Sequence, residues 1–414
     1  MQSSGTLEHL AFFEELARHS ESDSAWREVT AGLVTLRLVE SWLERGADVS
    51  RQDGWSVNAV RDAISEIDCG RPVRGVLRNI VDVMESTPTA DIHVIAPRLM
   101  AYASSLDFDA RWHLAIDVYR TVVAHTEPFD DSESVIAAHL RIGFCLRQTG
   151  DIAESSDAYG TAGQLAHSVG DMIGVLRARI GEAKIAILKG NFPEAESILD
   201  STIADAALHG LNAVESMALH DRASTADLRG NHELAVKLAY EALSKTQSDR
   251  DRDRILHDIA TAFYRLGVRT AARDAYLVLA ATAQEQYLRW ASSIQLLAIS
   301  ADSKMGPTFE RCRRDLASQP LPPVLLTEFQ FQTGRGYRLL GQFDVAESWL
   351  QSALRSAEAN NLNQLYFETE NELNVLRDVR RRHAPASEAK TVSFELDQIA
   401  DAVRDMRESM TAGV

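Results

Sequence analysis

Apolar residues recur along this chain at helical spacing, and glycines interrupt the pattern at regular intervals. Stretches such as SAWREVTAGLVTLRLVESWLERG are rich in Ala, Leu, Arg and Glu, and their apolar positions repeat every three or four residues. Alternating β-branched runs bounded by Asn-Gly or Asp-Gly turns do not occur. The pattern therefore predicts an all-α fold.

Five stretches of the chain align on a glycine that is followed, five positions later, by a small residue. Two of them are GNFPEAESILDSTIADA and GQFDVAESWLQSALRSA, and the five begin at Gly150, Gly190, Gly230, Gly267 and Gly341. Their spacings are 40, 40, 37 and 74 residues, and 74 is two units of 37. We therefore expect a hidden unit near Gly306 and a divergent first unit 40 residues before Gly150, at Ala110.

Each unit is predicted to be a pair of antiparallel helices. A glycine tolerates the left-handed backbone at a helix C-terminus, so it ends the first helix, and the small residue lets the second helix approach closely. A large residue four positions further fills the groove between neighbouring units. The small residues are Ala195, Ala235, Ala272 and Ala346, and the large ones are Tyr159, Leu199, Tyr276 and Leu350.

These offsets resemble those of tetratricopeptide repeats. The unit FQTGRGYRLLGQFDVAESWLQSAL carries Gly334, Tyr337, Gly341, Ala346 and Ala353 together. The resemblance covers roughly residues 90–383, but the units are longer than the usual ~34 residues and lack an early tryptophan. Units of 37–40 residues resemble those of bacterial signal-responsive regulators and peptide-sensing proteins. The resemblance implies a right-handed superhelical α-solenoid of about seven helix pairs.

Three regions are expected from the punctuation of the chain. Residues 1–88 predict an N-terminal helical bundle, interrupted at Asp53-Gly54 and Gly70, with a boundary near Pro88. Residues 89–383 hold the repeats. Residues 384–414 begin with a break at Pro385, and FELDQIADAVRDMRESM predicts an amphipathic helix that caps the open end of the stack.

Composition excludes several classes of partner. The chain has 414 residues, is 45% hydrophobic and carries a formal net charge of −17, so bulk attraction to nucleic acid or anionic lipid is not expected. Neither a signal sequence nor an apolar run of membrane-spanning length occurs, so we expect a cytoplasmic protein. Cys69, Cys145 and Cys312 lack CxxC spacing and are expected to be buried free thiols.

Catalytic and metal-binding motifs are not supported. HExxH, GxSxG, Walker A and GxGxxG do not appear in their required contexts, so we expect neither an enzyme nor a cofactor. The pairs His220-Asp221 and His257-Asp258 invite a general-base or metal interpretation. They fall at one offset in consecutive repeats, however, which favours repeated use of a surface position, and no third metal ligand is suggested by the spacing.

Candidate binding residues follow from the resemblance, because ligands of tetratricopeptide repeats dock on the concave face formed by the first helices. The positions 13, 10, 6, 3 and 2 residues before each turn glycine would face that groove, and basic residues outnumber acidic ones there. Such a groove would attract an acidic peptide or a free C-terminal carboxylate. The alternative is that the arginines pair with acids on neighbouring helices. The candidates are Arg147, Arg177, Lys184, His220, Arg254, His257, Tyr264, Arg265, Arg335 and Arg338.

We expect a non-enzymatic adaptor that binds a protein or peptide along this face. A regulator from another functional class is the alternative, in which a peptide or metabolite in the groove repositions the N-terminal bundle. A scaffold that self-assembles into a homo-oligomer is a third hypothesis. DNA binding would need a helix-turn-helix in VNAVRDAISEIDCGRPVRGVLRNIV, whose few arginines and acidic neighbours disfavour it.

Overall fold

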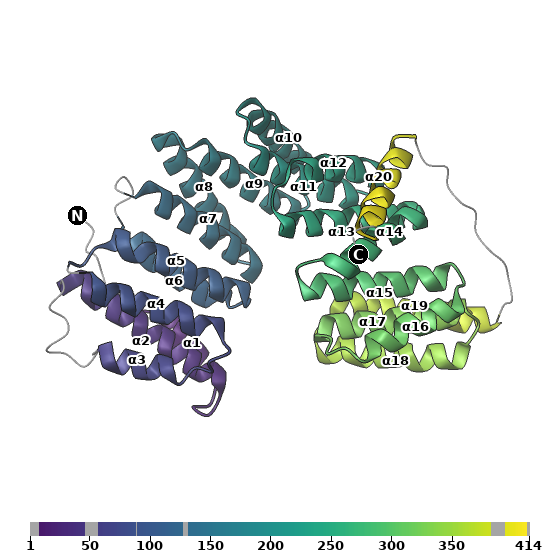
Figure 1. Ribbon diagram of the computed structural model, residues 1–414, viewed down its shortest axis with the longest axis horizontal. Coiled ribbons are helices and arrows are strands. Elements are labelled where there is room, and N and C mark those ends of the chain that lie inside the picture. Colours follow the sequence, from purple (N-terminus) through teal and green to yellow (C-terminus); the bar gives the residue numbers. More distant parts are fainter. Residues whose placement is uncertain (1–7, 46–56, 88, 127–130, 382–393, 412–414) are drawn as a thin grey trace. The chain divides into compact units, whose positions relative to one another are not determined.

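A computed structural model describes residues 8–45, 57–87, 89–126, 131–381 and 394–411 of the chain. Every regular element in these residues is a helix, and within each unit helices that follow one another in the chain pack as antiparallel pairs, for example α5 with α6, α7 with α8 and α11 with α12 (Figure 1). The predicted all-α stack of helix pairs is therefore confirmed. Asp53, Gly54, Trp55, Pro88 and Pro385 lie outside the described residues.

The helices fall into an N-terminal group, seven pairs and two final helices. The first group is α1 Leu10–Leu16, α2 Ser24–Arg45, α3 Val57–Ser65 and α4 Pro72–Ser86. The pairs are α5 Ile92–Phe108 with α6 Trp112–His125, α7 Ser132–Thr149 with α8 Ile152–Val169, α9 Met172–Leu188 with α10 Phe192–Leu208, α11 Asn212–Leu228 with α12 His232–Lys245, α13 Asp249–Leu266 with α14 Arg269–Thr282, α15 Gln286–Asp302 with α16 Gly306–Ala317, and α17 Pro323–Leu339 with α18 Phe343–Ala359. The last two are α19 Asn363–Arg381 and α20 Phe394–Thr411.

The turn between the two helices of each pair contains a residue with left-handed backbone. All five predicted turn glycines have positive φ, between 74° and 91°. In the two divergent units the same conformation is adopted by Ala110, with φ 59°, and by Lys304, with φ 54°. Gly306 is not the turn residue, because it starts α16 instead. The hidden turn thus lies 37 residues after Gly267, where the period places it.

Small residues in the first helices make room for large residues of the second helices. A Cβ atom added to Gly143 of α7 would lie 2.9 Å from the Tyr159 ring of α8, and one added to Gly181 of α9 would lie 2.3 Å from the same ring. Tyr159 is therefore packed between two successive units, as its position in the repeat predicts. Leu350 of α18 fills the corresponding space over Gly334 of α17, at 2.7 Å.

Two compact units make up the chain, residues 1–206 and residues 207–414, here called unit 1 and unit 2. The division falls inside the predicted repeat region, and the boundaries expected from the sequence stay predictions.

In unit 1 one hydrophobic core joins the N-terminal helices to the first repeats, through side chains such as Phe12, Leu36, Leu77, Tyr102 and Tyr119.

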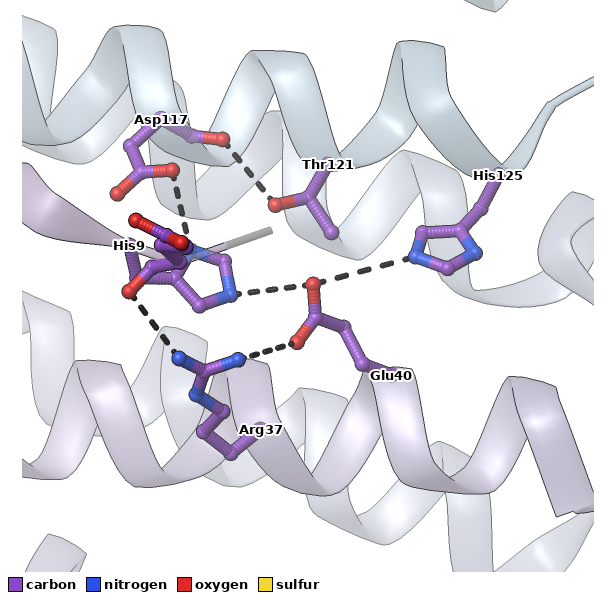
Figure 2. A network of polar contacts seen from close by, with 7 residues as sticks. His9, Arg37, Glu40, Asp117, Thr121 and His125 are labelled. Carbon is purple, nitrogen blue, oxygen red and sulfur yellow. Dashed lines mark hydrogen bonds and ion pairs between the residues drawn. The ribbon is translucent and has the colours of Figure 1, made fainter. Parts of the chain in front are cut away.

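A buried polar network connects α1 and α2 to α6 in unit 1 (Figure 2). His9 precedes α1, has left-handed backbone with φ 52° and is 2% exposed. Its Nδ1 atom lies 3.0 Å from Oδ1 of Asp117 on α6, and its Nε2 atom lies 3.2 Å from Oε1 of Glu40 on α2. Arg37 donates to the other oxygen of Glu40 at 3.3 Å, and Nε2 of His125 lies 4.0 Å from Glu40.

Charge is strongly coupled in this network. Burial disfavours protonated His9, but hydrogen bonds to Asp117 and Glu40 outweigh it and raise the pKa of His9 to about 9. Burial likewise disfavours ionised Glu40, but contacts with His125, His9 and Arg37 outweigh it and lower the pKa of Glu40 to about 2. At neutral pH the network is therefore a buried ion cluster.

The C-terminal helix α20 differs from the predicted end cap in its position. It packs in unit 2 against α14 and α12, the second helices of two internal pairs (Figure 1, yellow). Leu396, Ile399, Ala400 and Val403 are buried on one face of α20, as its amphipathic pattern predicts. The amphipathic pattern of α20 is a local property of the sequence. Which helices cover its apolar face depends on tertiary structure.

The three cysteines are free thiols. Cys145 is buried and Cys312 is half-buried, but Cys69 is exposed, so the expectation of burial was wrong for that residue. Cys69 lies in the turn between α3 and α4, where no core side chain is required.

Candidate functional site

The first helices of successive pairs contact one another within each unit. In unit 1, α7 lies against α5 and α9, and in unit 2 the series α11, α13, α15, α17 and α19 is continuous in the same way. The second helices of neighbouring pairs form no comparable series in the described part of the chain. The surface made by the first helices, called the inner face of each unit, is therefore where residues of successive repeats come together.

Tyr264, Asp302 and Arg335 form a cluster on the inner face of unit 2. The Tyr264 hydroxyl donates to Oδ2 of Asp302 at 2.5 Å, and Arg335 donates to Oδ1 of Asp302 at 2.9 Å and to the Tyr264 oxygen at 3.4 Å. These three side chains come from α13, α15 and α17, so one cluster spans three repeats. Burial raises the pKa of Tyr264, which keeps the phenol protonated as a donor.

The two predicted histidines share one carboxylate. Nε2 of His220 on α11 lies 2.7 Å from Oδ2 of Asp258 on α13, and Nδ1 of His257 lies 3.6 Å from Oδ1 of Asp258. Burial disfavours ionised Asp258, but hydrogen bonds with His220 and His257 outweigh it and hold the pKa of Asp258 below its usual range. Among the described residues, no three His, Cys, Asp or Glu side chains are arranged to hold a metal ion.

The other three predicted arginines of unit 2 also contact carboxylates. Arg254 lies 3.1 Å from Glu285, Arg265 pairs with Asp227, and Arg338 pairs with Glu372. Each of these pairs joins α13 or α17 to a neighbouring first helix or to the residue preceding it. The positive excess expected from the sequence is thus balanced in unit 2 by acids on adjacent helices, which was the alternative considered for these arginines.

Two acidic partners of the predicted arginines, Asp302 and Glu372, were missed from the sequence, each for its own reason. Asp302 belongs to the unit whose turn was assigned to Gly306 rather than Lys304, and Glu372 lies on α19, beyond the last complete pair. Had the turn been placed at Lys304, Asp302 would have fallen two residues before it, at one of the offsets used. The signal was therefore present for Asp302.

The predicted cations of unit 1 have different surroundings. The guanidinium of Arg147 lies 5.2 Å from the centre of the Phe144 ring, a cation–π contact. Lys184 is half-buried on α9. Arg177, also on α9, is exposed, and in the described residues no carboxylate lies within ion-pair distance of it. Arg177 is therefore unlike the arginines of the inner face in unit 2.

A cavity of about 440 Å³ adjoins Arg177 between α7, the end of α8 and the start of α9. Its apolar wall contains Ile136 and Leu140 from α7, Val169 from α8 and Ile173 from α9. Ile173 is 43% exposed and Val169 is 39% exposed, so this wall is open to solvent. The structure thus places one predicted cation, Arg177, beside an open apolar cavity.

No protein-family model matches the sequence, and no curated protein matches it. Solved structures are similar in fold. The Rap conjugation gene regulator of plasmid pLS20, in complex with the Phr* peptide, is 13% identical, covers 82% of this chain and 97% of its own, and has a TM-score of 0.50. The apo form of the quorum sensor NprR from B. thuringiensis is 13% identical, covers 83% and 92%, and has a TM-score of 0.49.

A kinesin light chain from Podosopora anserina with nearly identical TPR-like repeats covers 55% of this chain and 96% of its own, at 16% identity and a TM-score of 0.33. At such identities the likeness bears on the fold alone. This chain is built of tetratricopeptide-like helical repeats, as its turn spacing predicted. No helix in the described residues has the length and apolar character needed to cross a membrane.

Proposed function

We propose that this chain is a non-enzymatic module that binds a protein or peptide along the inner faces of its repeats. The observation that carries this proposal is the continuous series of polar side chains on the inner face of unit 2. Residues from α11 to α19 contribute to it, and neighbouring repeats are bridged by Asp258, Asp227, Asp302 and Glu372.

The chemistry of this series suits a polypeptide backbone. An arginine has five N–H donors and an ionised carboxylate has about four acceptor sites, so an ion pair leaves donors and acceptors for a ligand. Arg254 and Arg265 are each 46% exposed at the side chain, which keeps these groups accessible. Because charges are balanced here, we propose a ligand whose backbone alternates donors and acceptors, rather than a uniformly acidic one.

Partner capture tests this proposal. The full chain and an Arg254→Ala, Arg265→Ala double variant would be used to recover proteins from the cytoplasm of the source cells. Both side chains are half-exposed, so removing them should alter stability by less than ~1 kcal/mol. Arg355→Ala on α18, an exposed arginine outside the first helices, is the matched control. We expect at least a tenfold loss of capture in the double variant only, and equal capture by all three proteins would contradict the proposal.

A gated regulator is the second candidate, and the polar attachment of the N-terminal helices favours it. Besides the His9 network, Glu28 of α2 accepts from Arg71 at 2.7 Å and lies 3.0 Å from Arg111, next to α6. These ion pairs add to the apolar core that joins the same helices to the repeats, and ion pairs at such an attachment can be exchanged between two arrangements. Small-angle X-ray scattering of the protein with a captured peptide should then show a change in the radius of gyration, whereas a simple adaptor should show none.

A further inference from the structure

A second cavity of unit 1, of about 370 Å³, adjoins the His9 network. Its lining comes from the residues that lead into α1, from the second helices α6 and α8 with the turn before α8, and from one residue of α7. Its volume lies within the range of pockets that hold small ligands. The N-terminal helices and the repeats therefore enclose a space large enough for an occupant.

One carboxylate of this lining is buried and has an oxygen without a hydrogen-bond partner. Asp117 on α6 is 9% exposed, and its Oδ1 atom accepts a hydrogen bond from Nδ1 of His9 at 3.0 Å (Figure 2). Its Oδ2 atom is buried and accepts no hydrogen bond from the described residues. A buried acceptor without a partner costs free energy, which a donor on an occupant would offset. Asp117 thus points to an occupant that donates hydrogen bonds.

Acidic side chains surround Asp117 at the mouth of the cavity. Glu8, Asp151 and Glu154 line it and are exposed. Glu154 is paired with Arg120 at 3.1 Å, but no cation of the described residues lies within ion-pair distance of Glu8 or Asp151. The lining is therefore negative even with Arg120 charged, so it attracts a cation and repels a carboxylate or a phosphate.

Apolar side chains complete the lining. Leu10 of α1 is 60% exposed, whereas Ile116 and Leu146 are buried beneath the cavity. Exposed apolar surface of this kind is stabilised when an aliphatic chain covers it. The occupant that fits has both a cationic donor and a short hydrocarbon chain.

We infer that this cavity binds an aliphatic amine, with its ammonium group at Asp117 and its carbon chain against Leu10. An ammonium group has three donors and no acceptor, which matches the unpaired oxygen of Asp117 and the acidic rim. A free amine and a lysine side chain of another protein carry this same group, and the experiment distinguishes the two sources. The inference goes beyond the proposed function, because the cavity contains none of the inner-face residues of unit 2.

Binding of the amine should depend on the charge of His9. Asp117 from α6 and Glu40 from α2 face His9, and Arg37 and His125 contact Glu40. An ammonium group at Asp117 and the proton on His9 repel each other, so each weakens the binding of the other. The pKa of His9 is about 9 and that of an alkylammonium is about 10.4. Amine affinity should therefore rise about two- to fivefold from pH 7 to pH 9.

The test is isothermal titration calorimetry of the full chain at constant ionic strength. The probes are 1,5-diaminopentane, 1-aminopentane, the neutral analogue pentane-1,5-diol, and Nα-acetyl-lysine amide as a stand-in for a lysine side chain. We expect both pentylamines to bind at least tenfold more tightly than the diol. Acetyl-lysine amide should match 1-aminopentane if the site takes a lysine side chain, and should bind at least tenfold more weakly if it takes a free amine.

Variants assign the binding to the cavity. Asp117→Asn should weaken amine binding at least tenfold. Because Asp117 also holds His9, Asp151→Asn at the exposed rim provides a milder variant, with an expected loss of about two- to fivefold. Arg120→Gln should strengthen binding by a similar factor, which a purely structural role would not produce. Asp157→Asn is the matched control, because Asp157 is exposed on α8 and does not line the cavity.

His9→Gln separates this site from general attraction to an acidic chain. That variant should bind the amine at pH 7 as tightly as the wild type does above pH 9, and its affinity should not change with pH.

The inference is overturned if the diol binds as tightly as the amines, if no amine binds, or if Asp117→Asn and Asp151→Asn leave the affinity unchanged. An equal loss in Asp157→Asn would show that the amines are only counter-ions of a negatively charged protein, and would overturn it too. Partner capture through Arg254 and Arg265 is unaffected by any of these outcomes.

Discussion

The His9 network predicts that unit 1 becomes less stable as pH rises from neutral to alkaline. The pKa of His9 is about 9 in the folded chain and 6.5 in an unfolded one. Protonated His9 therefore stabilises the fold fully below pH 6.5, and this stabilisation is lost as pH rises through 9. A shift of this size corresponds to about 3 kcal/mol. The lowered pKa of Glu40 arises largely from the same contacts, so the figure of about 3 kcal/mol already includes its stabilising effect.

Reactivity of Cys145 measures this loss in unit 1 alone. Cys145 is 0% exposed on α7, and burial raises its pKa to about 11, so it reacts with a thiol reagent only when unit 1 opens. Cys69 and Cys312 would be replaced by serine. Labelling rates at pH 6 to 9.5, divided by rates in concentrated urea at the same pH, give the free energy of opening.

Wild-type protein is compared with His9→Gln, which cannot titrate, and with His19→Gln, which removes a partly exposed histidine as a control. The free energy of opening should fall by about 3 kcal/mol across this pH range for the wild type and for His19→Gln, relative to His9→Gln. If the free energy of opening differs between wild type and His9→Gln by the same amount at pH 6 and at pH 9, His9 is not protonated in the folded chain and the reasoning is refuted.

Three further predictions concern packing and turns. Gly181→Ala should destabilise unit 1 by about 1–3 kcal/mol in urea unfolding, because its Cβ would meet the Tyr159 ring, and Tyr159→Leu added to it should restore part of the loss; an unchanged midpoint would contradict this packing. Lys304→Gly should stabilise unit 2 by about 1 kcal/mol by relieving left-handed backbone, and Gly230→Ala should destabilise it by a similar amount; equal melting temperatures would refute the turn assignment. Ile399→Asp should release α20 and speed proteolysis of residues 394–411, unless α20 is held by something other than its apolar face.

The period of the turns was readable from the sequence because it is a local property. Left-handed backbone is favoured at glycine whatever surrounds it, so the glycines marked five turns in the sequence. Their spacing placed the other two turns at Ala110 and near Gly306, and the structure has them at Ala110 and Lys304. The buried small and large residues of each unit were also predictable from the sequence, because their distance in residues from the turn fixes which face of the helix they occupy.

The partners of the candidate binding residues depended on tertiary structure. Tyr264 and Asp302 are 38 residues apart and meet only because successive first helices stack side by side. The repeat length predicts which positions of neighbouring first helices lie side by side. It does not predict whether an arginine at such a position contacts an acidic side chain or solvent. Arg335 meets Asp302 while Arg177 meets none in the described residues, and both occupy first helices.

Contacts between distant elements had no signal in the sequence. His9 and Asp117 are 108 residues apart, and α20 crosses back to α12 and α14 rather than ending the stack. The sequence by itself determined the helices, their turns and the repeat, because these depend on backbone preference and on spacing along one helix. The tertiary structure decided which charges are neutralised, which cation stays open beside a cavity and where the last helix packs, because these depend on distances between segments that no local pattern encodes.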